Sequence, residues 1–215
     1  MLHHRPTPLL FLFRFAHTLP PPSLSTNNPT PYTERWLIPR MDLHFMTRDS
    51  GLPGGQWPPS ALFDTTIFLG LILPWNHTVP QSTSTFTTTC TASWPNGTFP
   101  SAHTEFPCTS PTHRENITFS LSPYTGLGER KPELSFSLHV VSYIDYDEGV
   151  VSVTYFGGVD VTANQPSEET SWLTCLLGRP LDGMRCRLNG VASKRGQLDV
   201  EVKGSSVEGK GNGGT

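Results

Sequence analysis

Four cysteines are the residues of this chain with the clearest capacity for chemistry. They are Cys90, Cys108, Cys175 and Cys186, and the chain contains no others. An even number of cysteines in so short a region is what a disulfide framework requires. Their spacing fits no zinc signature, because no two of them form a C-x-x-C pair. Sequence alone leaves every pairing open, with a slight preference for Cys90–Cys108 and Cys175–Cys186, whose members are close in sequence.

Three asparagines, Asn76, Asn96 and Asn116, stand in N-x-[ST] sequons within about forty residues of one another. Glycosylation of asparagine and formation of disulfides both belong to the secretory pathway. Thr and Ser are abundant here and make chance sequons frequent, so the argument rests on sequons and cysteines together. This combination predicts an extracellular, secreted glycoprotein.

Motifs for catalysis or cofactor binding are missing from the sequence. It has no G-x-S-x-G nucleophile elbow, no complete phosphate-binding glycine loop and no helical His-x-x-x-His. Asp145 and Asp147 have the spacing of a calcium loop, but the further ligands are out of register, so a charged hairpin turn is the better interpretation. We expect no metal, no cofactor and no catalysis. A pair of glycosidase carboxylates would have to come from residues in or beside predicted turns: Asp145, Asp147, Glu148, Asp160, Glu168 and Glu169.

Aromatic and basic side chains offer two further possibilities. Rings on an outer sheet face stack on sugars, and the candidates are Tyr143, Tyr146, Tyr155 and Trp172. For Tyr155 and Trp172, packing in a small core is the simpler interpretation. Arg185 and Arg187 alternate with apolar residues and are predicted to point outward, first as a solvated face and second as a binding patch. The dibasic pair Lys194-Arg195 is predicted to be a surface turn.

Composition excludes several classes of protein. The chain of 215 residues has 15 Lys+Arg against 18 Asp+Glu, a net charge of −3, and therefore no basic field for nucleic acid. Only 15% of its residues are charged, while 21 are Pro and 19 are Gly. This composition excludes a coiled coil and a long helical bundle.

Alternation of apolar and polar residues predicts a series of short strands. The clearest is a hairpin formed by 134–144 and 151–155, with an acidic turn that ends at Gly149. No segment has a sustained helical period. The fold predicted is therefore all-β, an antiparallel β-sandwich or small β-barrel. The other strands are expected at 117–121, 159–161, 172–176, 184–188 and 198–202, with a bulge at Gly157-Gly158.

The predicted domain organisation places this fold at residues 105–203. Residues 1–60 hold 11 of the 21 prolines and are predicted to be a disordered leader or an over-extended gene model. Residues 61–80 contain the apolar run Thr65–Leu73, too short to span a membrane but similar to a signal core, as if translation began at Met41 or Met46. The Thr/Ser-rich stretch 81–104 is expected to be an O-glycosylated stalk or an edge strand, and 204–215 a flexible Gly-rich tail.

Cys108, the hairpin Leu134–Tyr155, the motif Trp172-x-x-Cys175 and Cys186 together resemble a known group of proteins. These are the small cysteine-containing, β-rich proteins of the allergen and effector type that filamentous fungi secrete. The resemblance covers about residues 85–203 and concerns architecture, so no functional residue is carried over. It implies a non-catalytic, disulfide-stapled protein that acts at a host or cell surface.

The sequence therefore predicts a secreted, non-catalytic protein that binds a partner at a host, cell-surface or cell-wall site. The expected partner is a protein or glycan surface, with no nucleic acid and no membrane span. A first alternative is a carbohydrate-binding or carbohydrate-active secreted module. A second is an intracellular product of a misannotated gene, in which the sequons remain unused.

Overall fold

The structure is a computed structural model that describes residues 34–74, 84–109, 115–126, 128, 130–146 and 151–209. It is all-β, as the sequence predicts, and no helix within these ranges has the length and apolar character that would let it cross a bilayer. The strands are β1 (Arg35–Phe45), β2 (Thr65–Pro74), β3 (Thr85–Trp94), β4 (Phe106–Pro107), β5 (Glu115–Pro123), β6 (Ser135–Tyr146), β7 (Val151–Ala163), β8 (Ser171–Leu177), β9 (Met184–Leu188) and β10 (Leu198–Gly209). Two short 3-10 turns, Pro59–Ala61 and Pro132–Leu134, complete the described elements.

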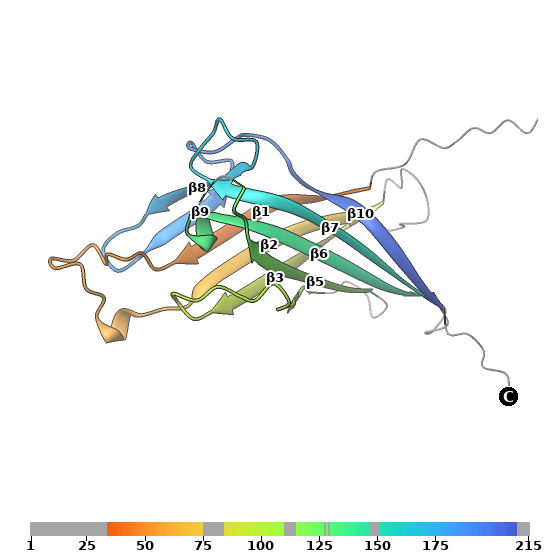
Figure 1. The fold of residues 1–215 in the computed structure, drawn as a ribbon, viewed down its shortest axis with the longest axis horizontal. Coiled ribbons are helices and arrows are strands. Elements are labelled where there is room, and N and C mark those ends of the chain that lie inside the picture. Colours follow the sequence, from red (N-terminus) through yellow and green to blue (C-terminus); the bar gives the residue numbers. More distant parts are fainter. Residues whose placement is uncertain are drawn as a thin grey trace, which may run out of the picture. The chain divides into compact units, whose positions relative to one another are not determined.

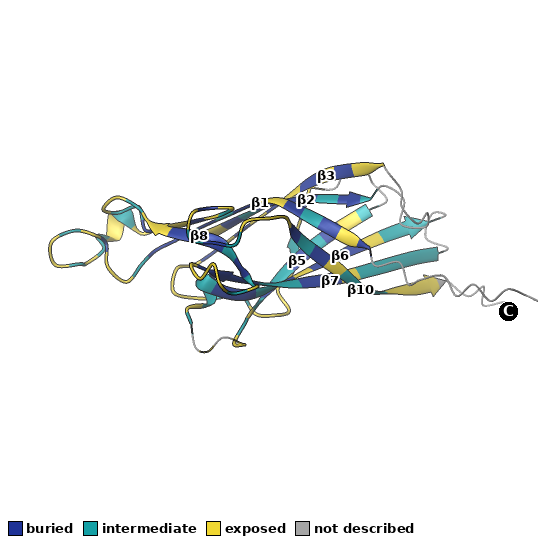
Figure 2. Ribbon diagram, turned by 90° about the horizontal axis from the view of Figure 1, so that it is seen from above, coloured by how far each residue is buried: buried dark blue, intermediate teal, exposed yellow. Residues whose placement is uncertain are grey.

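The strands form one bent sheet with the order β3-β2-β1-β9-β8-β7-β6-β5-β4 (Figure 1). Figure 2 shows the result as two layers, with β3, β2 and β1 on one side and β7 and β10 on the other. The apolar faces of both layers meet in a single core. The largest fully buried side chains come from both layers: Trp36, Phe45, Phe119, Phe136, Ile38, Met41, Ile67, Leu69, Leu71, Leu73, Ile117 and Leu121.

The sheet closes on itself at two places. Strand β10 pairs with both β1 and β7, so that β1, β10, β7, β8 and β9 form a closed ring of five strands. On the other side, a bridge between Cys90 and Cys108 joins β3 to the segment that follows β4. The prediction of a sandwich or small barrel is therefore confirmed.

Strand β1 corrects the prediction that residues 1–60 are a leader. Its side chains Trp36 and Ile38 are buried, and then the inward positions shift to Met41, Leu43 and Phe45. The shift is a β-bulge between Leu37 and Arg40, around a proline that has no N–H to donate. This bulge breaks the period-2 alternation, which is why the sequence pattern did not predict a strand. Residues 1–33 lie outside the described residues.

Strand β2 corrects the interpretation of residues 61–80 as a signal-like segment. Leu69, Leu71 and Leu73 are fully buried in the core, and β2 pairs with β1 along one edge and β3 along the other. A strand in the middle of a sheet carries apolar residues on both faces, so its sequence is a continuous apolar run like that of a signal core. The second half of the segment, 75–80, lies outside the described residues.

The Thr/Ser-rich stretch 81–104 contains β3, which agrees with the edge-strand alternative. Its inward side chains include Phe86, Thr88, Cys90 and Trp94, whereas Thr87, Thr89 and Thr91 are exposed. The folded domain therefore begins at β1 and not at residue 105, because β1, β2 and β3 supply one layer of the core.

The hairpin predicted around residues 134–155 is confirmed as β6 and β7, which pair from Ser135↔Thr162 to Tyr146↔Val151. The predicted bulge at Gly157-Gly158 lies instead in the partner strand, between Val202 and Gly204 of β10. Gly157 allows this strand to approach closely, since a Cβ there would stand 2.7 Å from the Glu201 carbonyl oxygen.

The predicted flexible tail also needs correction at its start. Strand β10 continues to Gly209 because the first half of β7 offers it a free edge, and the two pair from Glu201↔Gly158 to Gly209↔Val151. Only residues 210–215 of the predicted tail lie outside the described residues.

Strands β7 and β8 pair in parallel over two positions, Thr162↔Ser171 and Ala163↔Leu173, a departure from the purely antiparallel sheet that was predicted. The connection is held by Asn164, which adopts a φ of 61°. Its side-chain amide donates to the Cys175 carbonyl oxygen and accepts from the Cys175 N–H, both at 2.8 Å. Asn164 thereby replaces the backbone partner that β8 would otherwise lack at this position.

We expect Leu71→Ala to lower the free energy of unfolding by about 2–5 kcal/mol, because it leaves a cavity in the core. The neighbouring Ile72→Ala is the control, since Ile72 belongs to the opposite, half-buried face of β2. Urea unfolding of both variants makes the comparison. Equal and small effects of the two substitutions would contradict the position of β2 in the core.

Replacing Cys90 and Cys108 together with serine is expected to lower the free energy of unfolding by about 3 kcal/mol, the chain-entropy value for a loop of this size. The disulfide spans 18 residues and joins the two layers at the side away from β10. Urea unfolding under oxidising conditions measures the loss. A variant as stable as the parent would show that strand pairing alone closes this side.

Candidate functional site

Two rows of side chains cross the outer face of β3, β2, β1, β9 and β8. Strand register places Thr91, Phe68, Asp42, Arg187 and Thr174 side by side in the first row. The second row, one step along the strands, consists of Ser93, Thr66, His44, Arg185 and Leu176. Because alternate residues of a strand share a face, the neighbours of these residues along each strand point into the core, and the rows lie on the outer face. Thr174 is buried at the end of its row, where it bonds to Ala192 and Ser193.

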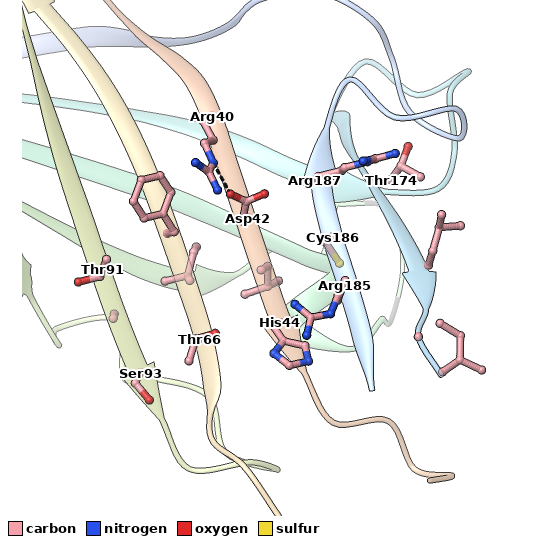
Figure 3. A pocket seen from close by; sticks show the side chains of 17 residues that line it. Arg40, Asp42, His44, Thr66, Thr91, Ser93, Thr174, Arg185, Cys186 and Arg187 are labelled. Atoms are coloured by element: carbon pink, nitrogen blue, oxygen red, sulfur yellow. Dashed lines mark hydrogen bonds and ion pairs between the residues drawn. The ribbon is translucent and has the colours of Figure 1, made fainter. Parts of the chain in front are cut away.

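These rows line a pocket of about 960 Å³ (Figure 3), which we call the arginine pocket. Arg40, Leu177 and Gly178 extend its lining beyond the rows. Leu176 and Leu177 are more than half exposed and form an apolar margin at the end of β8. Its volume lies in the range of sites that hold a small molecule or a few sugar units.

Arg40 is fixed by two contacts at one side of the pocket. Its Nε donates to Asp42 Oδ2 at 2.5 Å, and its guanidinium lies 4.7 Å from the centroid of the Phe68 ring. Both partners are exposed or half-exposed, so each contact contributes little to stability. Together they neutralise Arg40 and cover one face of Phe68.

Asp182 organises the other side of the pocket. Its carboxylate accepts three hydrogen bonds from Arg185, at 2.7–3.1 Å, and its carbonyl oxygen accepts one from His44 Nε2 at 2.6 Å. The His44 ring also stacks on Phe63 at 4.5 Å. Hydrogen bonds from Arg185, and to a smaller extent its charge, lower the pKa of the Asp182 carboxyl. Arg185 is therefore paired, like Arg40.

Arg187 differs from the other two arginines of the pocket. Within the described part of the chain its side chain makes no ion pair and no hydrogen bond, although Asp42 is its register partner on β1. Figure 3 shows it extending over β8 toward Thr174. Asp42 is already bonded to Arg40, so the charge of Arg187 is left for a ligand.

Three hydroxyl groups face the pocket from β2 and β3. Thr66, Thr91 and Ser93 are exposed, and among the described residues their hydroxyls bond to no other side chain. They are therefore free to donate to a ligand or accept from one. An unpaired guanidinium, a set of hydroxyls and an apolar margin suit an anionic ligand that also carries hydroxyl groups.

The sequence-predicted disulfides both form. Cys90 is bonded to Cys108 and Cys175 to Cys186, the pairing that was slightly preferred. The second disulfide joins β8 to β9 at paired positions on the inner side of the arginine pocket. It thereby fixes the two strands that carry Arg185, Arg187 and Leu176.

The three sequon asparagines have different positions. Asn96 is exposed in the turn after β3, and Asn116 is exposed on β5. Asn76 lies outside the described residues. Whether any of them carries a glycan remains a prediction.

Two of the candidate carboxylates named in the sequence analysis are bonded to different partners in the structure. Asp160 accepts a hydrogen bond from Ser137 at 2.5 Å, and Glu168 forms a bidentate ion pair with Arg130. Asp147 and Glu148 lie outside the described residues, so the acidic turn cannot be described. Among the residues that are described, no group of three or more metal-binding side chains is present.

The aromatic residues of interest do not form one surface. Tyr143 is 40% exposed on the outer face of β6, whereas Tyr155 stands opposite the fully buried Ser142 on the inner face. Trp172 packs against the core, with Lys194 Nζ 4.5 Å from its ring centroid. A flat sugar-binding surface of these rings is therefore absent.

A second polar cluster lies inside the sheet near the start of β1. The buried Glu34 accepts a hydrogen bond from Trp36 Nε1 at 2.6 Å, and Tyr146 bonds to Tyr155. Burial raises the pKa of both tyrosines above the ordinary value, and Glu34 raises it further. The two tyrosines are half-buried on the inner face, and neither they nor Glu34 line the arginine pocket.

The sequence analysis identified Arg185 and Arg187 as outward-facing but missed Arg40, Asp42 and His44. These three lie on β1, within the segment interpreted as a leader. The alternation of Met41, Leu43 and Phe45 with polar residues after the bulge was the sequence signal that could have identified this part of β1 as a strand. Comparisons of the chain with protein-family models, curated proteins and solved structures give no significant match.

We expect Arg185→Ala to raise the pKa of Asp182 toward its ordinary value, because the hydrogen bonds that favour the ionised carboxylate are lost. A lowered pKa means that Asp182 stabilises the fold at neutral pH and loses this effect as the pH falls through the folded-state pKa. Carboxyl carbon NMR during an acid titration measures the pKa. Arg179→Ala is the control, since Arg179 acts on Asp182 only through its charge and more weakly.

Proposed function

We propose that the protein is a secreted, non-catalytic binding protein, and that its arginine pocket binds an acidic oligosaccharide of a cell wall or cell surface. The observation that carries the proposal is Arg187, the pocket arginine whose charge no described residue neutralises. Arginine is suited to such a ligand because its planar donors match both oxygens of a carboxylate.

The remaining groups of the pocket match the rest of such a ligand. Thr66, Thr91 and Ser93 offer free hydroxyls, which suits the ring hydroxyls of a sugar. Leu176 and Leu177 offer exposed apolar surface, which suits the C–H faces of sugar rings. The ring of Phe68 contributes less, because Arg40 covers one of its faces.

Binding fits the pocket better than catalysis does. Both of its nearby carboxylates, Asp42 and Asp182, are ion-paired with arginines, and His44 is held by a backbone carbonyl group. A general acid or base needs a group that is free to exchange a proton with the substrate. The two carboxylates instead hold the side chains of Arg40 and Arg185 in position.

Secretion is supported by the two disulfides and by the exposed positions of Asn96 and Asn116. Disulfides persist in oxidising compartments, and N-glycans require exposed asparagines. The ligand class follows from this location, since acidic polysaccharides are extracellular polymers.

The test is calorimetric titration of the oxidised protein with tetragalacturonate, an acidic tetrasaccharide, and with the neutral cellotetraose. We expect binding of the acidic sugar alone, with an affinity that falls as salt rises. Arg187→Ala is expected to lower the affinity about tenfold or more, the effect of losing a hydrogen bond to a charged group. Arg187→Lys should lose part of it, because the bidentate geometry is lost.

Arg195→Ala is the matched control, since Arg195 is also an exposed arginine but does not line the pocket. Equal affinity for the two sugars, or an equal effect of the Arg187 and Arg195 substitutions, would contradict the proposed site.

A further inference from the structure

The outer face of the second layer, away from the arginine pocket, carries exposed aromatic side chains. Tyr143 on β6 is 40% exposed and Phe156 on β7 is 45% exposed. Strand register places Val141 directly beside Phe156, and the Phe156 ring lies over Gly204 of β10. We call Tyr143, Val141 and Phe156 the aromatic patch. Apolar surface that is contiguous in this way gains free energy when another group covers it.

The sequon Asn116-Ile117-Thr118 lies beside this patch on β5. Ile117 is fully buried, so Asn116 and Thr118 both point to the outer face. Asn116 is the register partner of Tyr143, and Thr118 is the register partner of Val141. Side chains at paired positions stand about 4.5–5.5 Å apart at their Cβ atoms. A group attached to the Asn116 amide therefore begins next to the Tyr143 ring.

We propose that Asn116 carries an N-linked glycan and that its first sugars lie over Tyr143 and the rest of the aromatic patch. In the attachment step a bond forms between Asn116 Nδ2 and C1 of N-acetylglucosamine, and the C1–O bond to a lipid pyrophosphate donor breaks. The amide loses one proton, and the lipid pyrophosphate leaves with the electron pair. The inference rests on the secretory location proposed above, but not on the ligand of the arginine pocket.

A sugar ring suits this patch because it has one apolar C–H face and hydroxyl groups at its edge. Its apolar face removes Tyr143 and Val141 from water, and its hydroxyls remain solvated. The neighbouring polar residues, Thr154 and Ser206, continue the row beyond Tyr143 and can bond to those hydroxyls. A covalent neighbour also needs no separate association, so even a weak contact with the ring persists.

Asn96 provides an internal control within the same chain. It is exposed in the turn after β3 with Gly97 at a φ of 76°, and it lines a small pocket with Leu62 and Phe63, away from the aromatic patch. Its glycan is expected to be present, and any effect of that glycan on stability should not depend on Tyr143.

The experiment uses the full chain secreted from a eukaryotic host, with glycopeptide mass spectrometry and thermal unfolding. We expect Asn96 and Asn116 both to be occupied. Asn116→Gln should lower Tm by about 2–4 °C, whereas any change caused by Asn96→Gln should be the same with and without Tyr143→Ser. In a Tyr143→Ser background the effect of Asn116→Gln should be markedly smaller, because the ring that the glycan covers is gone. Trimming to a single sugar should preserve most of the stabilisation, since the first sugar makes the contact.

Several outcomes would overturn the inference. A glycan on Asn96 but not on Asn116 would contradict the proposed modification. An effect of Asn116→Gln that does not depend on Tyr143 would contradict the proposed contact between glycan and ring. If light scattering showed that the Asn116→Gln protein and its glycosylated parent both form dimers that Tyr143→Ser dissociates, the patch would belong to a second copy of the chain. Secreted protein with neither sequon occupied would overturn this inference but leave the sugar titration of the arginine pocket unaffected.

Discussion

The structure depends on one strand, β1, which changes partner along its length. Its first residues pair with β10 and its last residues with β9, while β2 lies along its other edge. The bulge at Pro39 and Arg40 lies between the two halves and lets both halves turn their apolar residues inward. Because β1 is shared in this way, it joins the closed ring of strands to β2 and β3. Its outer face then carries Arg40, Asp42 and His44 into the arginine pocket.

The pocket is positively charged because it has more arginines than carboxylates to pair with them. Three arginines line it, while only Asp42 among its lining residues and Asp182 beside it are carboxylates. Each carboxylate is bonded to an arginine close to it in sequence, so Arg187 near the end of β9 is left over. The interior near Glu34 shows the opposite arrangement, since there each polar group meets another within the protein. The first arrangement favours a ligand, and the second favours a stable interior.

The sequence was sufficient for the second layer and insufficient for the first. In β5, β9 and most of β6 the more buried and less buried residues alternate, and local alternation is what a pattern search detects. Strand β1 was missed because its bulge shifts the alternation midway, and β2 because a central strand is apolar on both faces. The extension of β10 depends on a free edge of β7, which is a property of the assembled sheet.

The same reasons limited the prediction of the site. Both disulfides involve cysteines close in sequence, and their pairing could be preferred on that ground. The arginine pocket, in contrast, combines β1 with β9, whose contacts join residues far apart in the chain. A pattern within one segment of the sequence does not show which distant segments pair with each other. Outward-facing Arg185 and Arg187 were visible in the sequence, but their partners His44 and Asp42 became identifiable only once β1 was a strand.

The pairing of β1 with β10 has a consequence for biosynthesis. Arg35 is the register partner of Glu201, so the ring joins the two ends of the described domain. It can close only after the residues of β10 have left the ribosome, and topologies built on such distant contacts fold slowly. Until then the edge of β1 at Arg35–Ile38, which β10 occupies in the fold, stays unpaired. Unpaired strand edges of this kind are prone to pair with other chains, so the late arrival of β10 leaves a period in which the domain is open to association.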